Sequence, residues 1–484
     1  MKVLLALHAF PPERSGGVEC AAEGLALALR DLGVDVVAFV GRPDRGGPGD
    51  AALETGEHRG IRVHRYRRLA RRDDPADEYD PEASRLFEET LLAERPDLVH
   101  VLHWHRLSND LVTVAVRVGV PAIVMLQDLW VSCSRFFRMP RPGVSCDRDE
   151  SVEACGPCTA ELRPMEAGQF AVSLALRRES LRQELRLARL VTYSSPSHRA
   201  RLEALGPLAE PGIAANLRRL PIGLVDEIRP ARPLRPRADG VALRVGHWGN
   251  LAAIKGLEGL ARAAARATSP IELVLAGRES EPGLIARLEE LAAPARVSWL
   301  GPYEREALPE LTRDLDIVVF PSLAPETHGL VVDEALALGL PVLVSDAGAL
   351  GERVGGRGEV LPAGDVAAWA AALDRVARDE VRASLLAAAP GELVDRVSWA
   401  RTTLDAYHEV VRRGAPPRIE APELARCRVA RRDDAMLDIE WFVDRLQERY
   451  ALARRALAGD EAARAELERI DPASPDAGSG AMKQ

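Results

Sequence analysis

Short apolar runs alternate with amphipathic stretches along most of the chain, and this alternation predicts an α/β fold. In the first half, the pattern predicts strands at Val3–His8, Val36–Val40, Leu98–Leu102 and Pro121–Leu126, with helices at Val18–Leu32 and near Asp110–Val118. The second half repeats the pattern, with strands at Val241–His247, Ile271–Ala276, Val297–Leu300, Ile317–Phe320 and Pro341–Val344, and a helix at Gly256–Ala267. Because strands that alternate with helices form doubly wound parallel sheets, we expect one such sheet in each half.

The segment between the two halves, Pro221–Gly240, is rich in proline and charge, which is typical of a linker. Further on, Glu423–Ile470 carries one apolar helical stripe, and residues 471–484 have a composition typical of disorder. We therefore divide the chain into two α/β domains at 1–222 and 223–398, C-terminal helices at 399–470, and a disordered tail at 471–484.

The stretch Pro321–Asp346 carries the most specific chemistry. Glu326 lies in a loop between a buried strand and an apolar helix that begins at Gly329. Glu334 falls on the buried face of that helix, where a carboxylate needs hydrogen-bond partners. A loop, a helix N-terminus and two carboxylates suit a ligand with a phosphate and several hydroxyls, such as a nucleotide sugar. The alternative is an ordinary α/β unit in which Glu326 caps the helix and Glu334 forms a salt bridge.

Two other segments place glycine or lysine before a helix. Gly16 and Gly17 follow the first strand and permit close approach of the backbone to a ligand. Lys255 stands at the head of a helix in the second half, where a lysine can reach a phosphate held by backbone N–H groups. Taken alone, each pattern also fits a common turn or a surface lysine. The sequence has no complete G-x-G-x-x-G or Walker motif, which weighs against a dehydrogenase or an NTPase.

Together these segments resemble the retaining GT-B glycosyltransferases of family 4. Glu326 and Glu334, with seven residues between them, match the E-x7-E element of that family, and Gly339 and Pro341 continue the match. The resemblance implies two Rossmann-like domains that face each other across a cleft, with the C-terminal helices at 399–470 bracing the N-terminal domain. It also implies transfer of a sugar, with retention, from a UDP- or GDP-sugar to a glycan, a lipid-linked glycan or a small molecule in polysaccharide or glycoconjugate biosynthesis. Catalysis in this family needs no metal.

The resemblance assigns roles to particular residues. Glu334 would bind the ribose hydroxyls, and the catalytic candidates Glu326 and Lys255 would bind the sugar and the diphosphate. The full donor-binding set would be Gly16, Gly17, Asn250, Lys255, Glu326, His328, Gly329, Leu330, Val331 and Glu334. The acceptor side would include His103, His105 and Gln127.

The chain departs from the family pattern at two positions. Asn250 stands where the family usually has an arginine, and Gln127, followed by Asp128, stands where many relatives have histidine. A glutamine can hydrogen-bond a hydroxyl but cannot titrate near neutral pH. The histidines at 100, 103 and 105 surround a strand end, where they could bind zinc, although lining a polar cleft is the favoured interpretation.

Two other functions fit the same motifs. A GT-B sugar-nucleotide epimerase would act on the donor without any acceptor. A non-catalytic partner in a biosynthetic complex would bind a nucleotide sugar only, but the joint presence of Glu326, Glu334 and Lys255 argues against it.

Composition narrows the class of protein. A net charge of −9 over 484 residues argues against a general nucleic-acid binder. The apolar run in Met1–Phe10 is short and lacks a small-residue cleavage site, so it is interpreted as a strand rather than a signal peptide. Apolar runs of membrane-spanning length do not occur in the sequence. These features predict a cytoplasmic protein.

Two arginine-rich runs suggest a further interaction. One lies in Ile61–Arg72, and the other lies along the predicted helix Glu166–Leu190, beside Glu179 and Glu184. They would attract anionic lipid head groups or a lipid-diphosphate acceptor, which would make the protein peripheral at the inner face of the membrane. The favoured alternative is a solvated face in which the arginines pair with acidic residues.

Four cysteines lie in one loop-rich insertion, 129–160, just after Gln127: Cys133, Cys146, Cys155 and Cys158. The C-x2-C pair can direct two thiolates at one ion, and the other two cysteines would complete a tetrahedral site. Because the segment has little apolar content, a cross-link would help to order it. The sequence therefore predicts a structural zinc ion, with an iron–sulfur cluster as the second choice. Two disulfides or four unlinked thiols are the alternatives.

Elemental analysis tests this metal site. Protein purified without chelator should contain about one equivalent of zinc or an iron–sulfur cluster per chain, because one four-thiolate shell holds one centre. Substoichiometric zinc and iron, together with four freely titrating thiols in the insertion, would contradict the prediction.

Overall fold

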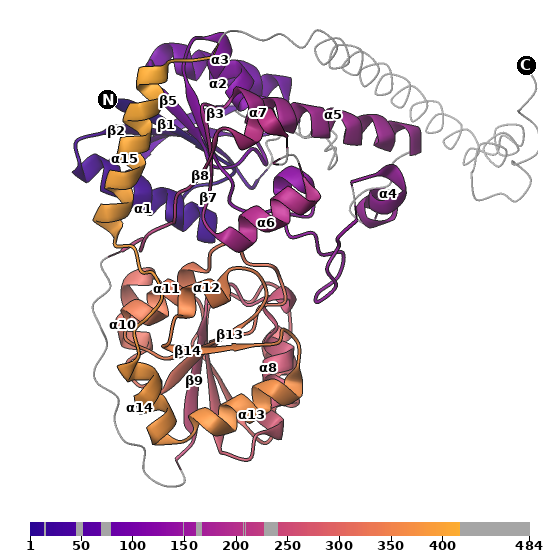
Figure 1. Cartoon of the computed structure of the whole chain (residues 1–484), viewed down its shortest axis with the longest axis vertical. Helices are drawn as coiled ribbons and strands as arrows, with labels where there is room; N and C mark the ends of the chain where they lie inside the picture. Colours follow the sequence, from indigo (N-terminus) through magenta and orange to yellow (C-terminus); the bar gives the residue numbers. More distant parts are fainter. Residues whose placement is uncertain are drawn as a thin grey trace, which may run out of the picture. The chain divides into compact units, whose positions relative to one another are not determined.

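A computed structural model of the chain describes residues 1–13, 16–44, 52–68, 79–148, 150–160, 167–206, 208, 210–226 and 241–416. Two Rossmann-like α/β domains follow one another along these residues (Figure 1). The predicted fold class is confirmed. The predicted helical segment at 423–470 and the tail at 471–484 lie outside the described residues, as does much of the linker.

Eight strands form the N-terminal sheet in the described part of the chain. Their spatial order is β3 (Leu53–His58), β4 (Ile61–Tyr66), β2 (Asp35–Gly41), β1 (Lys2–Leu7), β5 (Leu98–Val101), β6 (Ala122–Met125), β7 (Leu190–Tyr193) and β8 (Leu217–Arg219). Neighbouring strands are parallel except for the hairpin of β3 and β4. Alternate residues of β1 enter two different cores, Leu4 and Ala6 on one face and Leu5 and Leu7 on the other. A strand buried on both faces is therefore apolar throughout.

The second domain, which the family resemblance predicts to bind the donor and which is called the donor domain below for that reason alone, has six described strands. Their order is β11 (Arg296–Trp299), β10 (Ile271–Ala276), β9 (Leu243–Trp248), β12 (Ile317–Phe320), β13 (Val342–Ser345) and β14 (Gly358–Leu361), all parallel. The apolar runs predicted as strands in both halves are strands, with ends shifted by at most two residues.

Helices cover the two sheets. Those of the N-terminal half are α1 (Gly17–Asp31), α2 (Pro81–Glu94), α3 (Leu111–Arg117), α4 (Val152–Ala160), α5 (Ala167–Leu187), α6 (Pro196–Leu205) and α7 (Pro211–Ala214). The donor domain and the segment after it contribute α8 (Leu257–Arg266), α9 (Leu284–Ala292), α10 (Leu308–Leu311), α11 (Leu330–Ala337), α12 (Leu350–Val354), α13 (Val366–Val376), α14 (Asp379–Ala387) and α15 (Arg396–Arg413).

The strand order reverses beside the first strand of each domain. In the N-terminal sheet β1 lies between β2 and β5, and in the donor sheet β9 lies between β10 and β12. Open α/β sheets bind ligands beyond the carboxyl ends of the strands at such a point. Gly16 and His103 follow β1 and β5, and Lys255 and Glu326 follow β9 and β12. The topology thus directs these four residues to the ligand-binding edges of the sheets.

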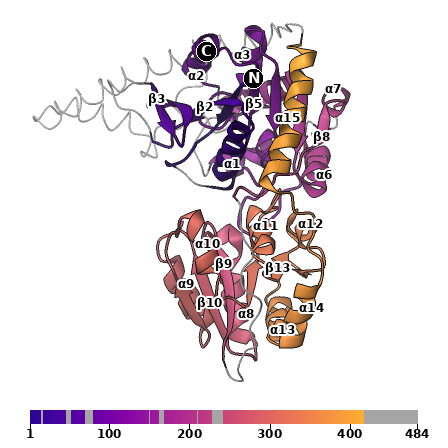
Figure 2. The same ribbon diagram turned by 90° about the vertical axis from the view of Figure 1, so that its left-hand side faces the viewer.

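The last described helix, α15, returns to the N-terminal domain and lies beside α1 (Figures 1 and 2). Its Trp399, Tyr407 and Val410 are buried in the same core as Leu5 of β1. The hydroxyl of Tyr407 lies 2.7 Å from Nδ1 of His100 on β5, and both side chains are buried. The described part of the predicted region 399–470 therefore belongs to the N-terminal core.

The arginine-rich run at Ile61–Arg72 includes a strand, β4, that the sequence analysis did not predict. Its described arginines pair with acidic side chains: Arg62 with Glu94, Arg65 with Glu13, Arg67 with Asp44 and Glu54, and Arg68 with Asp80. Arg71 and Arg72 lie outside the described residues.

The arginines of α5 are also engaged within the protein. Arg182 and Arg186 pair with Glu210, and Arg189 donates to the carbonyls of Gly414 and Ala415 beyond the end of α15. This pairing favours the alternative of a compensated surface over attraction to anionic lipids. Helices long and apolar enough to cross a membrane do not occur among the described residues.

Replacing Tyr407 with phenylalanine should destabilise the protein. Burial lowers the pKa of His100 to about 3, so its imidazole is neutral and relies on Tyr407 for a hydrogen bond at Nδ1. Leaving this buried nitrogen unpaired should lower the free energy of unfolding by about 1–3 kcal/mol. Urea denaturation measures the loss. Val397→Ala, at an exposed position of the same helix, is the control and should have little effect. A stability of Tyr407→Phe equal to that of the unchanged protein would contradict this account.

Candidate functional site

The donor-domain part of the site is built on the loop that joins β12 to α11, residues 321–329, which is called the donor loop below. The backbone N–H of Glu326 donates to the carbonyl of Ala347 at 3.2 Å, and the carbonyl of Glu326 accepts from the N–H of Ala349 at 2.7 Å. A Cβ at Gly348 would lie only 2.2 Å from the carbonyl oxygen of Glu326, and Gly348 has a φ of +77°. Only glycine allows the two segments to approach this closely, so Gly348 helps to fix the backbone of Glu326.

Lys255 reaches Glu326 from the end of the neighbouring strand. Its Nζ lies 2.6 Å from Oε1 of Glu326, and the hydroxyl of Ser322 donates to the same oxygen at 2.8 Å. Burial alone would raise the pKa of Glu326, but the lysine charge and the hydrogen bonds outweigh it and lower the pKa. Glu326 is therefore ionised. The structure brings together the two predicted catalytic residues as a half-buried ion pair.

Glu334 is buried one turn into α11, and both of its oxygens have partners. Oε2 accepts from the indole N–H of Trp248, and Oε1 lies 2.8 Å from the guanidinium of Arg305. Burial raises the pKa of Glu334, and Arg305 only partly offsets this effect. Arg305 also donates to Asp226 at 2.8 Å, at the end of the N-terminal half. A ribose that binds Glu334 must therefore share or replace the contact with Arg305.

His328 and the start of α11 form the other wall of the donor loop. Nε2 of His328 lies 2.9 Å from Oδ2 of Asp333, and the guanidinium of Arg353 donates to both oxygens of Asp333. These three side chains are buried, so His328 holds the loop in place rather than presenting a free imidazole. Gly329 has a φ of +96°, and α11 begins directly after it. The first backbone N–H groups of the helix, at Leu330 and Val331, therefore follow the loop immediately.

The glycine loop of the N-terminal domain approaches the same helix end. A Cβ at Gly17 would lie 3.9 Å from Cδ1 of Leu330, and Leu330 packs against the core that contains β1. The carboxylate of Glu19 lies against Gly16, where a Cβ would be 2.6 Å from Oε2. Asn250, in contrast, is exposed, and its side chain accepts from Ser280 rather than from Lys255 or Glu326. The structure thus joins the glycine loop to α11 and leaves Asn250 apart from the ion pair.

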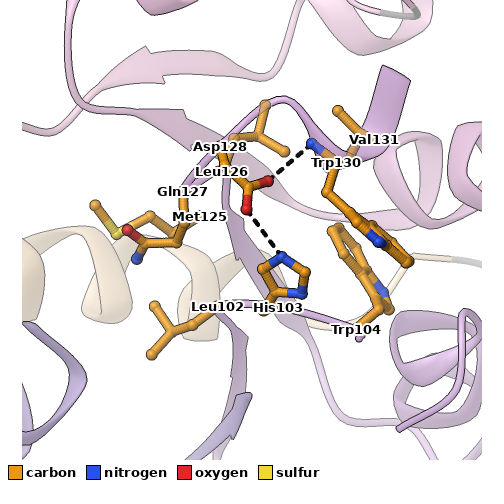
Figure 3. A pocket seen from close by; sticks show the side chains of 9 residues that line it. All are labelled: Leu102, His103, Trp104, Met125, Leu126, Gln127, Asp128, Trp130 and Val131. Carbon is orange, nitrogen blue, oxygen red and sulfur yellow. Dashed lines mark hydrogen bonds and ion pairs between the residues drawn. The ribbon is translucent and has the colours of Figure 1, made fainter. Parts of the chain in front are cut away.

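The predicted acceptor-side residues form a polar cluster at the ends of β1, β5 and β6. The imidazole of His103 points toward Asp128, with Nε2 3.2 Å from Oδ2, and Trp104 and Trp130 stack beside it in a small pocket (Figure 3). The backbone N–H of His105 donates to Nδ1 of His103 at 3.0 Å. Because Nδ1 accepts, Nε2 carries the proton and donates to Asp128.

His8 and Glu19, which the sequence analysis did not assign to the acceptor side, extend this cluster. The ring of His8 lies edge-on to that of His103, with 4.7 Å between the ring centroids, and Nε2 of His8 is 3.1 Å from Glu19. Burial lowers the pKa of His8, and the contact with Glu19 opposes this only in part. Gln127 takes part through its backbone, because its carbonyl accepts from the hydroxyl of Thr327 in the donor loop at 2.6 Å.

The four cysteines of the insertion are free thiols. Among the described residues, no three His, Cys, Asp or Glu side chains are grouped so that they could hold a metal ion. Burial raises the pKa of Cys155 to about 11, so a metal that binds this thiol would have to displace its proton. The zinc or iron–sulfur site at Cys133, Cys146, Cys155 and Cys158 stays a prediction that elemental analysis tests.

Arginine side chains also contribute to the order of the insertion, beside any metal that it binds. The guanidinium of Arg138 donates to the carbonyls of Ser132 and Cys146, and Arg135 donates to that of Cys158. Arg177 lies over the ring of Trp130 and pairs with Glu150. The guanidinium groups of Arg135 and Arg138 each satisfy at least two carbonyls in this loop-rich segment.

Three functional contacts were missed from the sequence. Trp248 is the last residue of β9, at the same sheet edge as Lys255, and its position in the sequence could have identified it. Thr327 is the neighbour of Glu326, but its partner in the N-terminal domain is 200 residues away. Arg305 lies in a charged loop that reads as surface, so the sequence carries no signal for its contact with Glu334.

Comparisons with known proteins agree with this geometry. A family model described as "Glycosyl transferase 4-like domain" matches residues 16–214, and one described as "Glycosyl transferases group 1" matches residues 242–379. Sucrose-phosphate synthase from Thermosynechococcus elongatus aligns with a TM-score of 0.59 and 19% identity, over 85% of this chain and 99% of that one. The fold is GT-B. HepE from Anabaena, whose structure holds UDP and glucose, aligns with a TM-score of 0.56 and 19% identity, over 84% of this chain and all of that one.

Curated relatives of this GT-B chain match only in part. The D-inositol 3-phosphate glycosyltransferase of Mycobacterium marinum is 33% identical over 187 residues, which are 37% of this chain and 39% of that protein. The phosphatidyl-myo-inositol mannosyltransferase of Mycobacterium leprae is 33% identical over 132 residues, 27% of this chain and 35% of that protein. The chain spans about two fifths of the length of the curated relatives it matches.

Replacing Arg305 with methionine should destabilise the protein by leaving Glu334 and Asp226 without their shared cation. Breaking a buried ion pair from one side costs about 3 kcal/mol in the free energy of unfolding. Arg305→Lys, which keeps the charge, should lose less.

The loss should also depend on pH. The pKa of Glu334 is already raised by burial, and removal of Arg305 raises it further, so the folded variant binds a proton more readily than the unfolded chain. The deficit should therefore shrink as the pH falls from about 8 to about 5. Urea denaturation at several pH values measures it, and a deficit independent of pH would argue against an ionised Glu334 in this pair.

Proposed function

We propose that this GT-B chain transfers a sugar, with retention, from a nucleotide-diphosphate sugar to a hydroxyl-bearing acceptor. The ion pair of Lys255 and Glu326 is the observation that carries the proposal, because Glu326 lies in the loop just before the N-terminus of α11, where backbone N–H groups are free to bind an anion. Lys255 can bind a phosphate and Glu326 can bind a sugar hydroxyl, and a nucleotide sugar has both groups.

The diphosphate would be bound by Lys255 and the N-terminal backbone of α11. An ammonium group has three N–H donors, so Lys255 can bond a phosphate oxygen while it keeps its contact with Glu326. As the bond between the anomeric carbon and the diphosphate oxygen breaks, negative charge grows on the leaving diphosphate. Lysine and helix amides that face this charge before the reaction stabilise it without reorganisation, so these residues would supply the charge stabilisation.

The sugar and the nucleoside would be held by the two glutamates. Glu326 is ionised and would accept hydrogen bonds from hydroxyls of the transferred sugar. Glu334 would accept from the ribose, with Arg305 moving aside or bonding one oxygen while the ribose bonds the other. In a front-side substitution, the acceptor hydroxyl bonds to the anomeric carbon and its proton passes to the departing phosphate oxygen. A covalent intermediate on a nearby carboxylate is the other route to retention.

The acceptor would bind against the N-terminal domain, where His8, His103 and His105 gather at the strand ends. Imidazoles and backbone groups can hydrogen-bond the hydroxyls of a glycan, a lipid-linked glycan or a small polyol. The partly matching relatives are named for an inositol phosphate and a phosphatidyl-inositol acceptor. We propose a cytoplasmic enzyme, and the paired arginines of β4 and α5 give it no evident need for a membrane contact.

Thermal shift with UDP-, GDP- and dTDP-sugars tests the function. A donor at a hundred times its Kd stabilises the native state by about 2.7 kcal/mol, so the matching donor should raise the apparent Tm clearly. Glu334→Ala should weaken this binding. Glu326→Ala should still bind the nucleotide, but its turnover with donor and acceptor should fall about a hundredfold, as for loss of one transition-state contact. Glu290→Ala, an exposed carboxylate on α9, is the control and should do neither.

Each other outcome points elsewhere. Conversion of the donor in the absence of an acceptor would identify an epimerase. Donor binding without turnover across a broad acceptor panel would identify a non-catalytic partner. Absence of any shift with all three donor classes would refute nucleotide-sugar binding, and unchanged turnover in Glu326→Ala would refute the role of that residue.

A further inference from the structure

The N-terminal domain binds the donor loop at Thr327, the residue after Glu326. The hydroxyl of Thr327 donates to the backbone carbonyl of Gln127 at 2.6 Å, and the carbonyl of Thr327 accepts from the hydroxyl of Ser194 at 2.8 Å. Gln127 follows β6 and Ser194 follows β7, which are adjacent parallel strands. The hydroxyl and the carbonyl of one donor-loop residue are therefore bound at the strand ends of the other domain.

A second contact between the two domains lies nearby. The backbone N–H and the hydroxyl of Ser197, in the first turn of α6, both donate to Oε1 of Glu352 on α12 of the donor domain. A carboxylate at the N-terminus of a helix also meets the positive end of the helix dipole. His198, in the same turn, bonds the carbonyl of Asp128, so the segments that hold Thr327 are tied to each other.

These contacts act on the residue next to Glu326. The backbone N–H and carbonyl of Glu326 are bound within the donor domain, whereas the hydroxyl and carbonyl of Thr327 are bound by the N-terminal domain. Two consecutive residues of the donor loop are thus held by different domains. The side chain of Glu326 is set by Lys255 and Ser322, which belong to the donor domain alone.

We propose that Thr327 is a positioning residue, which aligns Glu326 for turnover only while the N-terminal domain binds Thr327 through Gln127 and Ser194. This inference rests on the proposed function. In it, Thr327 touches no substrate, and its contacts with the N-terminal domain hold the backbone beside the carboxylate that binds the sugar. Donor binding, which the donor domain supplies, does not depend on it. The alignment of Glu326 for turnover does.

Thr327→Val in the full-length protein removes the hydroxyl and keeps the shape of the side chain. Backbone amide exchange of residues 323–329, measured without ligand, should become faster in this variant, and Ser194→Ala should have the same effect. Thr327→Ser restores the donor group and should restore slow exchange. Thr312→Val is the matched control, because it removes a buried threonine hydrogen bond to Leu308 within the donor domain and should leave exchange of 323–329 unchanged.

Kinetics separate positioning from a merely structural role. The donor used is whichever of UDP-, GDP- and dTDP-glucose gives the largest thermal shift, and nucleoside diphosphate release is measured. In Thr327→Val, kcat should fall about tenfold, the effect of one hydrogen bond on the barrier, while the Kd of the free nucleoside diphosphate stays within about twofold. Thr327→Ser should recover most of kcat. A structural role alone would lower stability and change both constants or neither.

The outcomes distinguish this inference from the proposed function. If the unchanged protein binds none of the three donors, the proposed function fails, and with it the alignment of a catalytic Glu326. Faster exchange confined to Thr327→Val and Ser194→Ala would then still establish that the N-terminal domain holds the donor loop at Thr327. If exchange of 323–329 is the same in Thr327→Val as in the unchanged protein, or if kcat is unaffected while the donor binds, the positioning role is overturned.

Discussion

The ion pair between Lys255 and Glu326 depends on two loops that touch backbone to backbone. A Cβ at Gly256 would lie 2.0 Å from the carbonyl oxygen of Pro321, and the N–H of Leu323 donates to the carbonyl of Ile254 at 2.8 Å. The ends of β9 and β12 can approach this closely because glycine with a positive φ occupies position 256. A larger residue there would push apart the loops that carry the ammonium and the carboxylate. The site chemistry therefore begins with a constraint on the backbone.

The second carboxylate is accommodated in a different way. Glu334 is buried with a tryptophan N–H and an arginine, and the arginine is shared with Asp226. One cation between two carboxylates leaves the group with a net negative charge, which agrees with a raised pKa at Glu334. The protein thus buries a carboxylate that can accept hydrogen bonds from a hydroxyl-rich ligand. It also links that carboxylate to the segment where the two domains meet.

The sequence predicted the parts of this arrangement that are local. The apolar runs at Val3–His8 and Ile317–Phe320 could only be buried parallel strands, and the order of elements then directed Lys255 and Glu326 to one sheet edge. The hairpin of β3 and β4 was missed because β4 carries Arg62 and Arg65 and leads into further arginines, a pattern that resembles a charged surface segment. Contacts across long separations, such as Thr327 with Gln127, leave no local pattern, since a backbone carbonyl is the same at every residue. The arginine contacts of the cysteine insertion were missed for a related reason, because the carbonyls that these arginines bind cannot be inferred from residue types.

The return of α15 to the N-terminal core has a consequence for how the protein is made. The core around β1 includes Trp399 and Tyr407, although the donor domain lies between them and the rest of that core in the sequence. In folding terms the donor domain is an insertion into a discontinuous N-terminal domain. During synthesis the first sheet emerges early, but the face that α1 covers lacks its second helix, α15, until residues 396–413 have left the ribosome. The domain that is synthesised first is therefore completed last, after the domain inserted within it.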